Sequence, residues 1–424
     1  MASSAVARDA LLRPVLSLFT GIAILVVGIG LLFTALGLRA GLMDFPVTVT
    51  GLVMSAYFAG FIVGTYVCPA IIRRAGHIRA FAAMASVAST MPILHALVVT
   101  PWAWGALRLL TGACVVGLYM VIESWLNALA PNSGRGKIFA AYMATTLGAL
   151  ALGQFLILVG DVLGFTPFAL VSILLSLALV PVALTRVAEP PPVAAPRPAL
   201  RRLLAVAPVG FVGAVASGLL NGAFFGMGAV FAQRVGMDKA GVAAFMSATI
   251  IGGALLQWPI GQLSDRRDRR LVLAAVCASA ALLAALAFFA ERFSGPLLLT
   301  VAFFYGGLAF TVYGISVAHV NDLLEPARVL EATGTLLLLH GIGAVIGPSA
   351  AGFLMQQLGP GSLLVFFALV LAAAGGYALY RYKLVARRPV GEPVGYMPMA
   401  DSSQALLQLD PRTETESVPP SRRR

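Results

Sequence analysis

Long apolar runs alternate with short polar connections rich in Gly and Pro along most of the chain. A membrane-spanning helix needs about 20 apolar residues. The pattern predicts twelve spans, at approximately 14–37, 47–71, 78–99, 101–128, 136–160, 165–185, 205–231, 240–263, 271–290, 296–319, 332–357 and 361–383. The runs are unbroken, unlike the alternating strands of an outer-membrane barrel. We therefore predict an all-α membrane protein whose first helix is not cleaved.

The composition of the chain agrees with this pattern. Of 424 residues, 59% are hydrophobic and only 11% are charged, whereas a soluble domain carries about 25% charged residues. A soluble enzyme, a disordered protein and a fibrous repeat are thereby excluded. The three cysteines and four histidines are scattered through the sequence, so neither a disulfide framework nor a zinc site is expected. We expect no metal and no cofactor.

The distribution of basic residues predicts the orientation. With twelve spans and both termini on one side, 24 of the 29 Lys and Arg residues fall on the side of the termini and 4 on the other, while Arg108 lies inside a span. Basic residues concentrate in cytoplasmic loops. We therefore expect a multi-pass protein of the plasma (inner) membrane with both termini in the cytoplasm.

The chain divides into two similar halves. Residues 1–185 and 205–384 form the two predicted six-helix bundles, residues 186–204 a Pro-rich cytoplasmic linker, and residues 385–424 a tail whose composition is typical of disorder. Segment 118–127 matches segment 312–321 at an offset of 194, and Ser55 and Gly60 match Ser247 and Gly252 at an offset of 192. These nearly constant offsets indicate a six-plus-six duplication.

Three segments carry a family resemblance. Residues 261–270, Gly-Gln-Leu-Ser-Asp-Arg-Arg-Asp-Arg-Arg, resemble the G-x-L-x-D-R-x-G-R-R loop of the major facilitator superfamily, with Asp268 in place of the second Gly. A degenerate copy occupies 69–79, where Arg73 stands at the position of the loop Asp, and Arg108-Leu-Leu-Thr-Gly112 is similar to the family's R-x-x-x-G element. Segments 257–261 and 135–143 look most like a poorly characterised bacterial branch, the YcaD-like transporters.

The resemblance implies a secondary transporter of a small solute, with two pseudo-symmetric bundles that give access alternately to each side of the membrane. One element departs from the drug/proton antiporters of the family: Gly153-Gln154 stands where they carry Gly-Pro. The chain contains no nucleotide-binding, HExxH or GxSxG motif. We therefore expect no enzyme activity and energy from an ion gradient, most simply protons. The expected partners are the solute, protons and lipid, with no nucleic acid, and the expected state is a monomer. An uncoupled facilitator, a membrane sensor and a membrane-embedded enzyme stay as alternatives.

Polar residues inside the spans are the candidates for the site. Glu123 is the one acidic residue well inside a predicted span, where a carboxylate costs about 2.5–3.5 kcal/mol to insert. The helical period places Arg108, Tyr119 and Glu123 on one stripe; alternatively, Glu123 snorkels to the nearby membrane surface. The substrate and coupling set predicted from the sequence is Glu123, Arg108, Tyr119, His319, Asn321, Asn221 and Gln154. Tyr57 and Tyr305 are weaker candidates, and His95 and His340 are more typical of packing.

A charged latch between the halves follows from the resemblance. In the family the loop Asp meets the start of a helix in the opposite half when the cytoplasmic side is closed. Here Asp265, followed by Arg266, would meet Arg135 and Lys137, and Arg73 or Arg74 would meet Glu331 under the same two-fold relation. The alternative is that these residues are ordinary charges of cytoplasmic loops.

Overall fold

The computed structural model describes residues 2–130, 135–185, 190, 198–290, 295–384, 396 and 402–407. The first half comprises α1 (Ala2–Leu42), α2 (Val47–Ala75), α3 (His77–Leu97), α4 (Pro101–Leu129), α5 (Arg135–Phe155), the 3-10 helix η2 (Leu156–Leu158), α6 (Thr166–Leu177) and α7 (Leu179–Ala183). The second half comprises α8 (Leu200–Val206), α9 (Pro208–Arg234), α10 (Lys239–Arg266), α11 (Arg269–Ala290), α12 (Gly295–Ala309), α13 (Thr311–Asn321), α14 (Pro326–Leu358) and α15 (Ser362–Leu384). The short α16 (Gln404–Leu407) follows.

The described residues contain twelve helices long and apolar enough to cross a membrane, which confirms the predicted spans. Three spans combine two elements: α5 with η2, α6 with α7, and α12 with α13. The seventh span begins at Pro208 and not near residue 205, because α8 forms a separate short helix just before it. Proline at the first turn of α4, α9 and α14 fixes where these helices start, since proline lacks the N–H that would be unpaired there.

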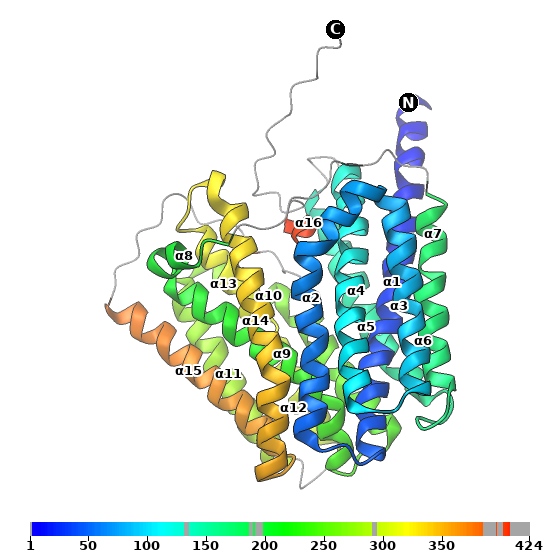
Figure 1. The fold of residues 1–424 in the computed structure, drawn as a ribbon. Helices are drawn as coiled ribbons and strands as arrows, with labels where there is room; N and C mark the ends of the chain where they lie inside the picture. The colour runs from blue at the N-terminus through cyan, green and yellow to red at the C-terminus, as the bar shows by residue number, and fades with distance from the viewer. Residues whose placement is uncertain are drawn as a thin grey trace.

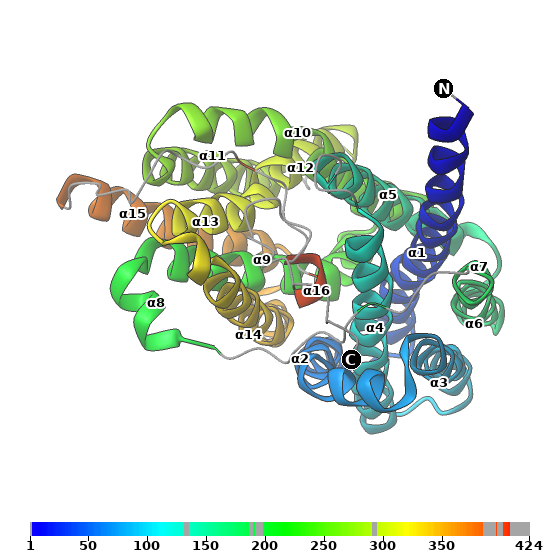
Figure 2. The same ribbon diagram turned by 90° about the horizontal axis from the view of Figure 1, so that it is seen from above.

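The two halves form two bundles with the same internal packing (Figures 1 and 2). In the first bundle α1 packs on α5, α2 on α4, and α3 on α6. In the second bundle the equivalent pairs are α9 with α14, α10 with α12, and α11 with α15. The sequence offset of 192 relates α2 to α10, and the offset of 194 relates α4 to the helices α12 and α13 of the tenth span, in agreement with this pairing. The packing therefore confirms two pseudo-symmetric six-helix bundles.

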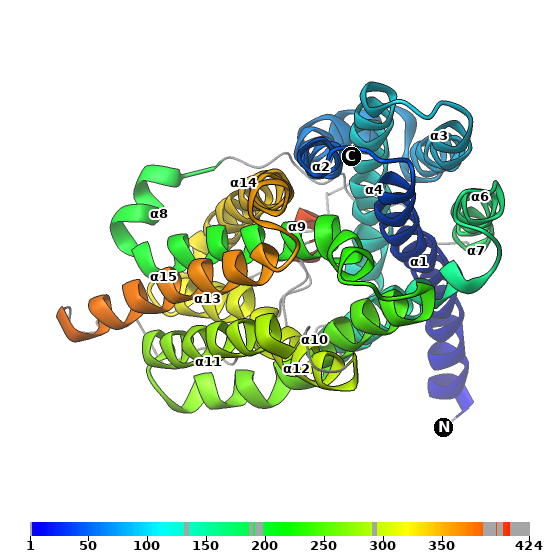
Figure 3. The same cartoon turned by 90° about the horizontal axis from the view of Figure 1, so that it is seen from below.

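The bundles meet most closely on one side of the molecule, which Figure 3 views from below. We call the side with the start of α1, the end of α2 and α16 the terminal side, and the other the opposite side. On the opposite side a Cβ added to Gly51 of α2 would lie 2.4 Å from the carbonyl oxygen of Pro348 in α14. The hydroxyls of Ser55 and Ser349 are hydrogen-bonded at 2.7 Å, and Val47 N donates to Gln356 Oε1 at 2.7 Å. Small residues allow such close helix approach in membranes.

The symmetry-related contact closes the opposite side a second time. α5 packs on α10, and the Ser247 hydroxyl donates to the carbonyl oxygen of Ala151 at 2.8 Å. Between them α1 contacts α9, where Gln233 Nε2 donates to the carbonyl oxygen of Leu38 at 3.3 Å. The opposite side is therefore sealed by contacts between the bundles, chiefly those of α2 with α14, α5 with α10 and α1 with α9.

Part of the chain after α15 is packed between the bundles. Tyr396 and residues 402–407 lie at the terminal side, where α16 stands between the two groups of helices (Figure 2). The prediction that residues 385–424 are disordered is therefore wrong for Tyr396 and residues 402–407, which are ordered and packed. The reason is local: Ser402 and Ser403 donate hydrogen bonds to a buried carboxylate, and Ala405 and Leu406 are buried.

Candidate functional site

A cavity of about 180 Å³ lies between the two bundles. By this measure one water molecule needs roughly 10–15 Å³, so the space is large enough for a small organic molecule. Side chains from α1, α2, α4 and α5 line one wall, and side chains from α9, α10, α13 and α14 line the other. A site between two bundles near the centre of the spans is typical of alternating-access transporters.

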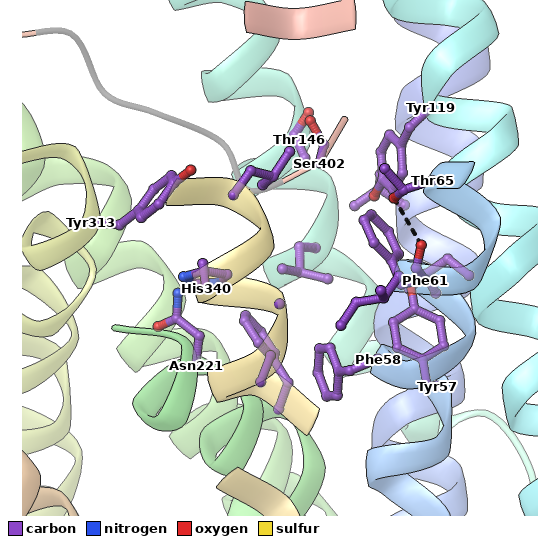
Figure 4. A pocket seen from close by; sticks show the side chains of 18 of the residues that line it. Tyr57, Phe58, Phe61, Thr65, Tyr119, Thr146, Asn221, Tyr313, His340 and Ser402 are labelled. Carbon is purple, nitrogen blue, oxygen red and sulfur yellow. Dashed lines mark hydrogen bonds between the residues drawn. The ribbon is translucent and has the colours of Figure 1, made fainter. Parts of the chain in front are cut away.

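The wall from the first bundle is aromatic (Figure 4). Its aromatic side chains are Phe33, Tyr57, Phe58, Phe61, Tyr66 and Tyr119, and aliphatic side chains from α1, α2 and α5 lie beside them. The ring centroids of Phe33 and Tyr57 are 4.8 Å apart and those of Tyr57 and Phe58 are 5.3 Å apart, both in edge-to-face geometry. Such contacts fix the orientation of the rings. The wall thus offers a rigid apolar surface to a flat or apolar part of a ligand.

The wall from the second bundle carries hydrogen-bonding groups. Asn221, Gln257, Tyr313 and His340 all line the cavity. His340 Nδ1 is 2.9 Å from the Ser217 hydroxyl, and its ring lies 4.8 Å from that of Tyr313. Asn221 Oδ1 is buried and has no hydrogen-bond partner within the described residues. A buried unpaired acceptor is costly, so this atom is suited to a donor on a bound solute.

Arg108 lies behind the aromatic wall, on the same helix α4 as Tyr119 and Glu123. Its guanidinium carbon is 4.2 Å from the ring centroid of Phe33 and 4.5 Å from that of Tyr57, and the side chain is fully buried. None of its three nitrogen atoms has a hydrogen-bond partner in the described part of the chain. Two cation–π contacts hold the charge, and a planar guanidinium fits between two rings better than an ammonium group. Of the predicted stripe, only Tyr119 faces the cavity.

Glu123 is fully buried and lies one helical turn beyond Tyr119 toward the terminal side. The hydroxyls of Tyr142 and Ser402 each donate to its Oε1 at 2.5 Å, and the Ser403 hydroxyl donates to Oε2. The side chain therefore does not snorkel to the surface. Ser402 also lines the cavity, so the carboxylate lies at the terminal-side mouth of the cavity. Hydrogen bonds to a charged group stabilise it by about 1.5–3 kcal/mol each.

The remaining candidates from the sequence have other surroundings. Asn221 lines the cavity, as expected of a solute contact. Gln154 accepts a hydrogen bond from Thr34 and donates to the carbonyl oxygen of Leu150 at 3.1 Å, so it joins α5 to α1. His319 and Asn321 are buried at the end of α13, outside the lining of the cavity.

Sequence reasoning misses several residues of the site. Tyr142, Ser402 and Ser403 contact Glu123, yet the pattern of polar residues within the spans singles out none of them. His340 is expected to be a packing residue but lines the cavity, and Tyr57 is a weaker candidate but forms part of the aromatic wall. The one available signal is Tyr142, which sits in the segment 135–143 that carries the resemblance.

The motif loop forms a network within the second bundle. Arg269 bonds to Asp322 at 2.8 Å and to Asp265 at 3.0 Å. Asp268, which replaces the family's glycine, pairs with Arg270 at 2.9 Å. The loop charges therefore tie α10, α11 and the end of α13 together.

The proposed latch pairs are apart in this structure. Among the described residues no ion pair joins Asp265 to Arg135 or Lys137, or Glu331 to Arg73 or Arg74. The exposed residues of the predicted latch are Lys137, Glu331, Arg73, Arg74 and Arg266. This is the arrangement expected while the terminal side is open; the closed arrangement stays a prediction.

Comparisons with known proteins identify relatives along nearly the whole chain. The family model described as Major Facilitator Superfamily matches residues 15–324 and 210–398. An uncharacterized MFS-type transporter, YcaD, of Salmonella newport (strain SL254) is 28% identical over 362 residues, covering 84% of this chain and 93% of the relative. Another uncharacterized MFS-type transporter, from Enterobacter sp. (strain 638), is 29% identical over 386 residues, covering 90% and 97%.

Solved structures share the fold. The nucleoside transporter NupG superposes with a TM-score of 0.72 at 15% identity, covering 89% of this chain and all of NupG. A bacterial homologue of the human lysosomal transporter Spinster, in an inward-facing and occupied conformation, superposes with a TM-score of 0.68 at 15% identity, covering 88% of this chain and 96% of the homologue. At these identities the similarity establishes the architecture and not the substrate.

Proposed function

Since the chain belongs to the major facilitator superfamily and is a transporter of its YcaD-like branch, we propose that it is a proton-coupled secondary transporter of a small amphipathic solute. The observation that carries this proposal is Glu123, a fully buried carboxylate in a span, at the mouth of a cavity between the two bundles. A carboxylate is rare inside spans and in transporters often belongs to a proton relay.

The orientation follows from charge. The 24-to-4 division of basic residues supports a cytoplasmic location for the terminal side. The sealed opposite side then faces outward, and the structure represents an inward-facing state. In the outward-facing state the contacts of α2 with α14 and of α5 with α10 on the opposite side separate, and the bundles approach on the cytoplasmic side.

Glu123 would couple a proton to this exchange. As a carboxylate in an apolar span it needs hydrogen-bond donors; once protonated it is neutral and tolerates surroundings that offer none. The donors around it come from α5 and from the segment after α15. Tyr142 moves with Glu123 because α4 and α5 lie in one bundle, whereas Ser402 and Ser403 adjoin α16, which also contacts α14. Movement of the bundles therefore changes the access of these two serines to the carboxylate, so protonation favours one state over the other.

The lining of the cavity indicates the class of solute. Among the described residues, those that line the cavity include no Asp, Glu, Lys or Arg. One wall is aromatic and the other carries amide, imidazole and phenol groups, which suits a neutral molecule with a flat apolar part and several hydrogen-bonding groups. NupG, whose structure is similar, is a nucleoside transporter, and uridine and adenosine have this chemistry. Nucleosides are therefore the first probes for uptake and binding.

Glu123→Gln is expected to abolish accumulation driven by a proton gradient, because the amide mimics the protonated acid and cannot release a proton. Exchange of solute across the membrane without a gradient should persist. The measurement is uptake and counterflow in proteoliposomes, with Glu325→Gln as the control, since Glu325 is exposed. Normal accumulation by Glu123→Gln, or accumulation by the wild type after an ionophore collapses the gradient, would indicate an uncoupled facilitator.

Asn221→Ala is expected to weaken solute binding about 2- to 10-fold, because one hydrogen bond contributes about 0.5–1.5 kcal/mol. Asn321→Ala is the matched control, a buried Asn outside the cavity lining. Thermal-shift titration with each nucleoside gives the affinities. Equal effects of the two substitutions would show that the solute does not contact this wall.

The latch predicts that Arg73→Glu and Glu331→Arg each impair transport and that the double variant regains at least half of the wild-type rate. Each surface pair contributes about 0.2–1 kcal/mol, enough to bias a two-state equilibrium. Arg79→Glu with Glu331→Arg is the control, since Arg79 is an exposed charge of the same loop region. The latch is wrong if the control pair restores transport as well as the Arg73 pair does.

A further inference from the structure

Tyr396 and residues 402–407 together contact both bundles at the terminal side. The backbone N–H of Tyr396 donates to Asp265 Oδ1 of α10 at 2.7 Å. Ser402 and Ser403 donate to the two oxygens of Glu123 on α4. One short stretch of chain thus contacts a charged residue of each bundle.

The segment is packed as an interior element. Ser403 is 1% exposed, and Ala405 and Leu406 are fully buried. α16 contacts α4 and α14, which belong to different bundles. Figure 1 shows α16 between these helices at the terminal side.

Two glycines accommodate the ring of Tyr396. A Cβ added to Gly261 would lie 1.9 Å from a ring carbon of Tyr396, and a Cβ added to Gly314 would lie 2.6 Å from its hydroxyl oxygen. Any other residue at these positions would collide with the ring. Gly261 is the first residue of the motif loop, so the segment reaches the same loop that carries Asp265.

The contacts of the segment occupy groups that the transport cycle needs. Both oxygens of Glu123 accept hydrogen bonds, Oε1 from Tyr142 and Ser402 and Oε2 from Ser403, so the segment covers the group that would exchange protons. Ser402 enters the lining of the cavity. Asp265, the expected latch residue, already accepts from Tyr396 and Arg269. The bundles cannot approach at the terminal side while chain fills the space between them.

We propose that the segment containing Tyr396 and residues 402–407 is a tethered plug that inhibits the transporter by occupying the terminal-side mouth and covering Glu123. The inference rests on the proposed function, in which Glu123 must take up and release protons at this mouth. Release of the plug frees Glu123 and Asp265 together, so a single event permits both coupling and latch closure.

The test measures the accessibility of Glu123 without a solute. Dicyclohexylcarbodiimide, an apolar reagent that modifies carboxyl groups in membranes, is applied to the reconstituted protein, and mass spectrometry follows modification at Glu123. The chain ending at Gly395 should react about tenfold or more faster than the chain ending at Asp410, because it lacks two hydrogen bonds to a charged group. The chain ending at Asp410 keeps the plug and should match the full chain.

A variant of the full chain controls for misfolding of the truncated chain. Ser402→Ala with Ser403→Ala should also accelerate modification, and a synthetic peptide of residues 396–407 should slow modification of the chain ending at Gly395. Equal rates of modification at Glu123 in all chains would contradict the proposal that this segment is a plug. That outcome does not involve solute transport, so it is distinguishable from failure of the proposed function, which the Glu123→Gln coupling assay decides separately.

Discussion

Gly51 on α2 and Pro348 on α14 lie so close that a single methyl group on Gly51 would collide with the backbone of the facing helix. The Ser55–Ser349 hydrogen bond lies beside this contact, and Ser247 with Ala151 closes the symmetry-related one. Lipid provides no hydrophobic drive for helices to associate. Small side chains and hydrogen-bonded hydroxyl groups therefore determine where the bundles touch. The side on which they touch determines from which side the cavity is open.

Because the bundles are sealed together on the opposite side, the mouth of the cavity and Glu123 lie toward the terminal side. The two walls of the cavity are chemically different although the bundles share one packing plan. The first bundle supplies most of the rings and places Arg108 behind them, whereas the second supplies the amide and imidazole groups. Duplication accounts for the shared architecture, and divergence of side chains makes one half an apolar contact surface and the other a source of hydrogen bonds.

The helices and their arrangement in two bundles can be predicted from the sequence, because each membrane span is recognisable from its own run of apolar residues. Glu123 and Asn221 are found for the same reason: a polar residue in an apolar run is visible without coordinates. The phenylalanines of the aromatic wall are not found, because Phe58 and Phe61 in an apolar run look the same whether they face lipid, another helix or a cavity. The contacts of Ser402 and Ser403 depend on a tertiary arrangement across 279 and 280 residues, which composition cannot indicate.

Alternation between two sealed sides is the central claim, and distances across both sides test it most directly. Electron paramagnetic resonance would measure the distances within two pairs of spin labels. The terminal pair is at Ile71 on α2 and Leu330 on α14, both exposed toward the terminal side. The opposite pair is at Leu42 and Leu358, both exposed where α1 and α14 end on the opposite side. In the chain ending at Gly395, which lacks the plug, the account predicts two populations in which the terminal pair approaches whenever the opposite pair separates, with low pH or bound solute changing their ratio. Fixed distances, or two pairs that lengthen together, would contradict it.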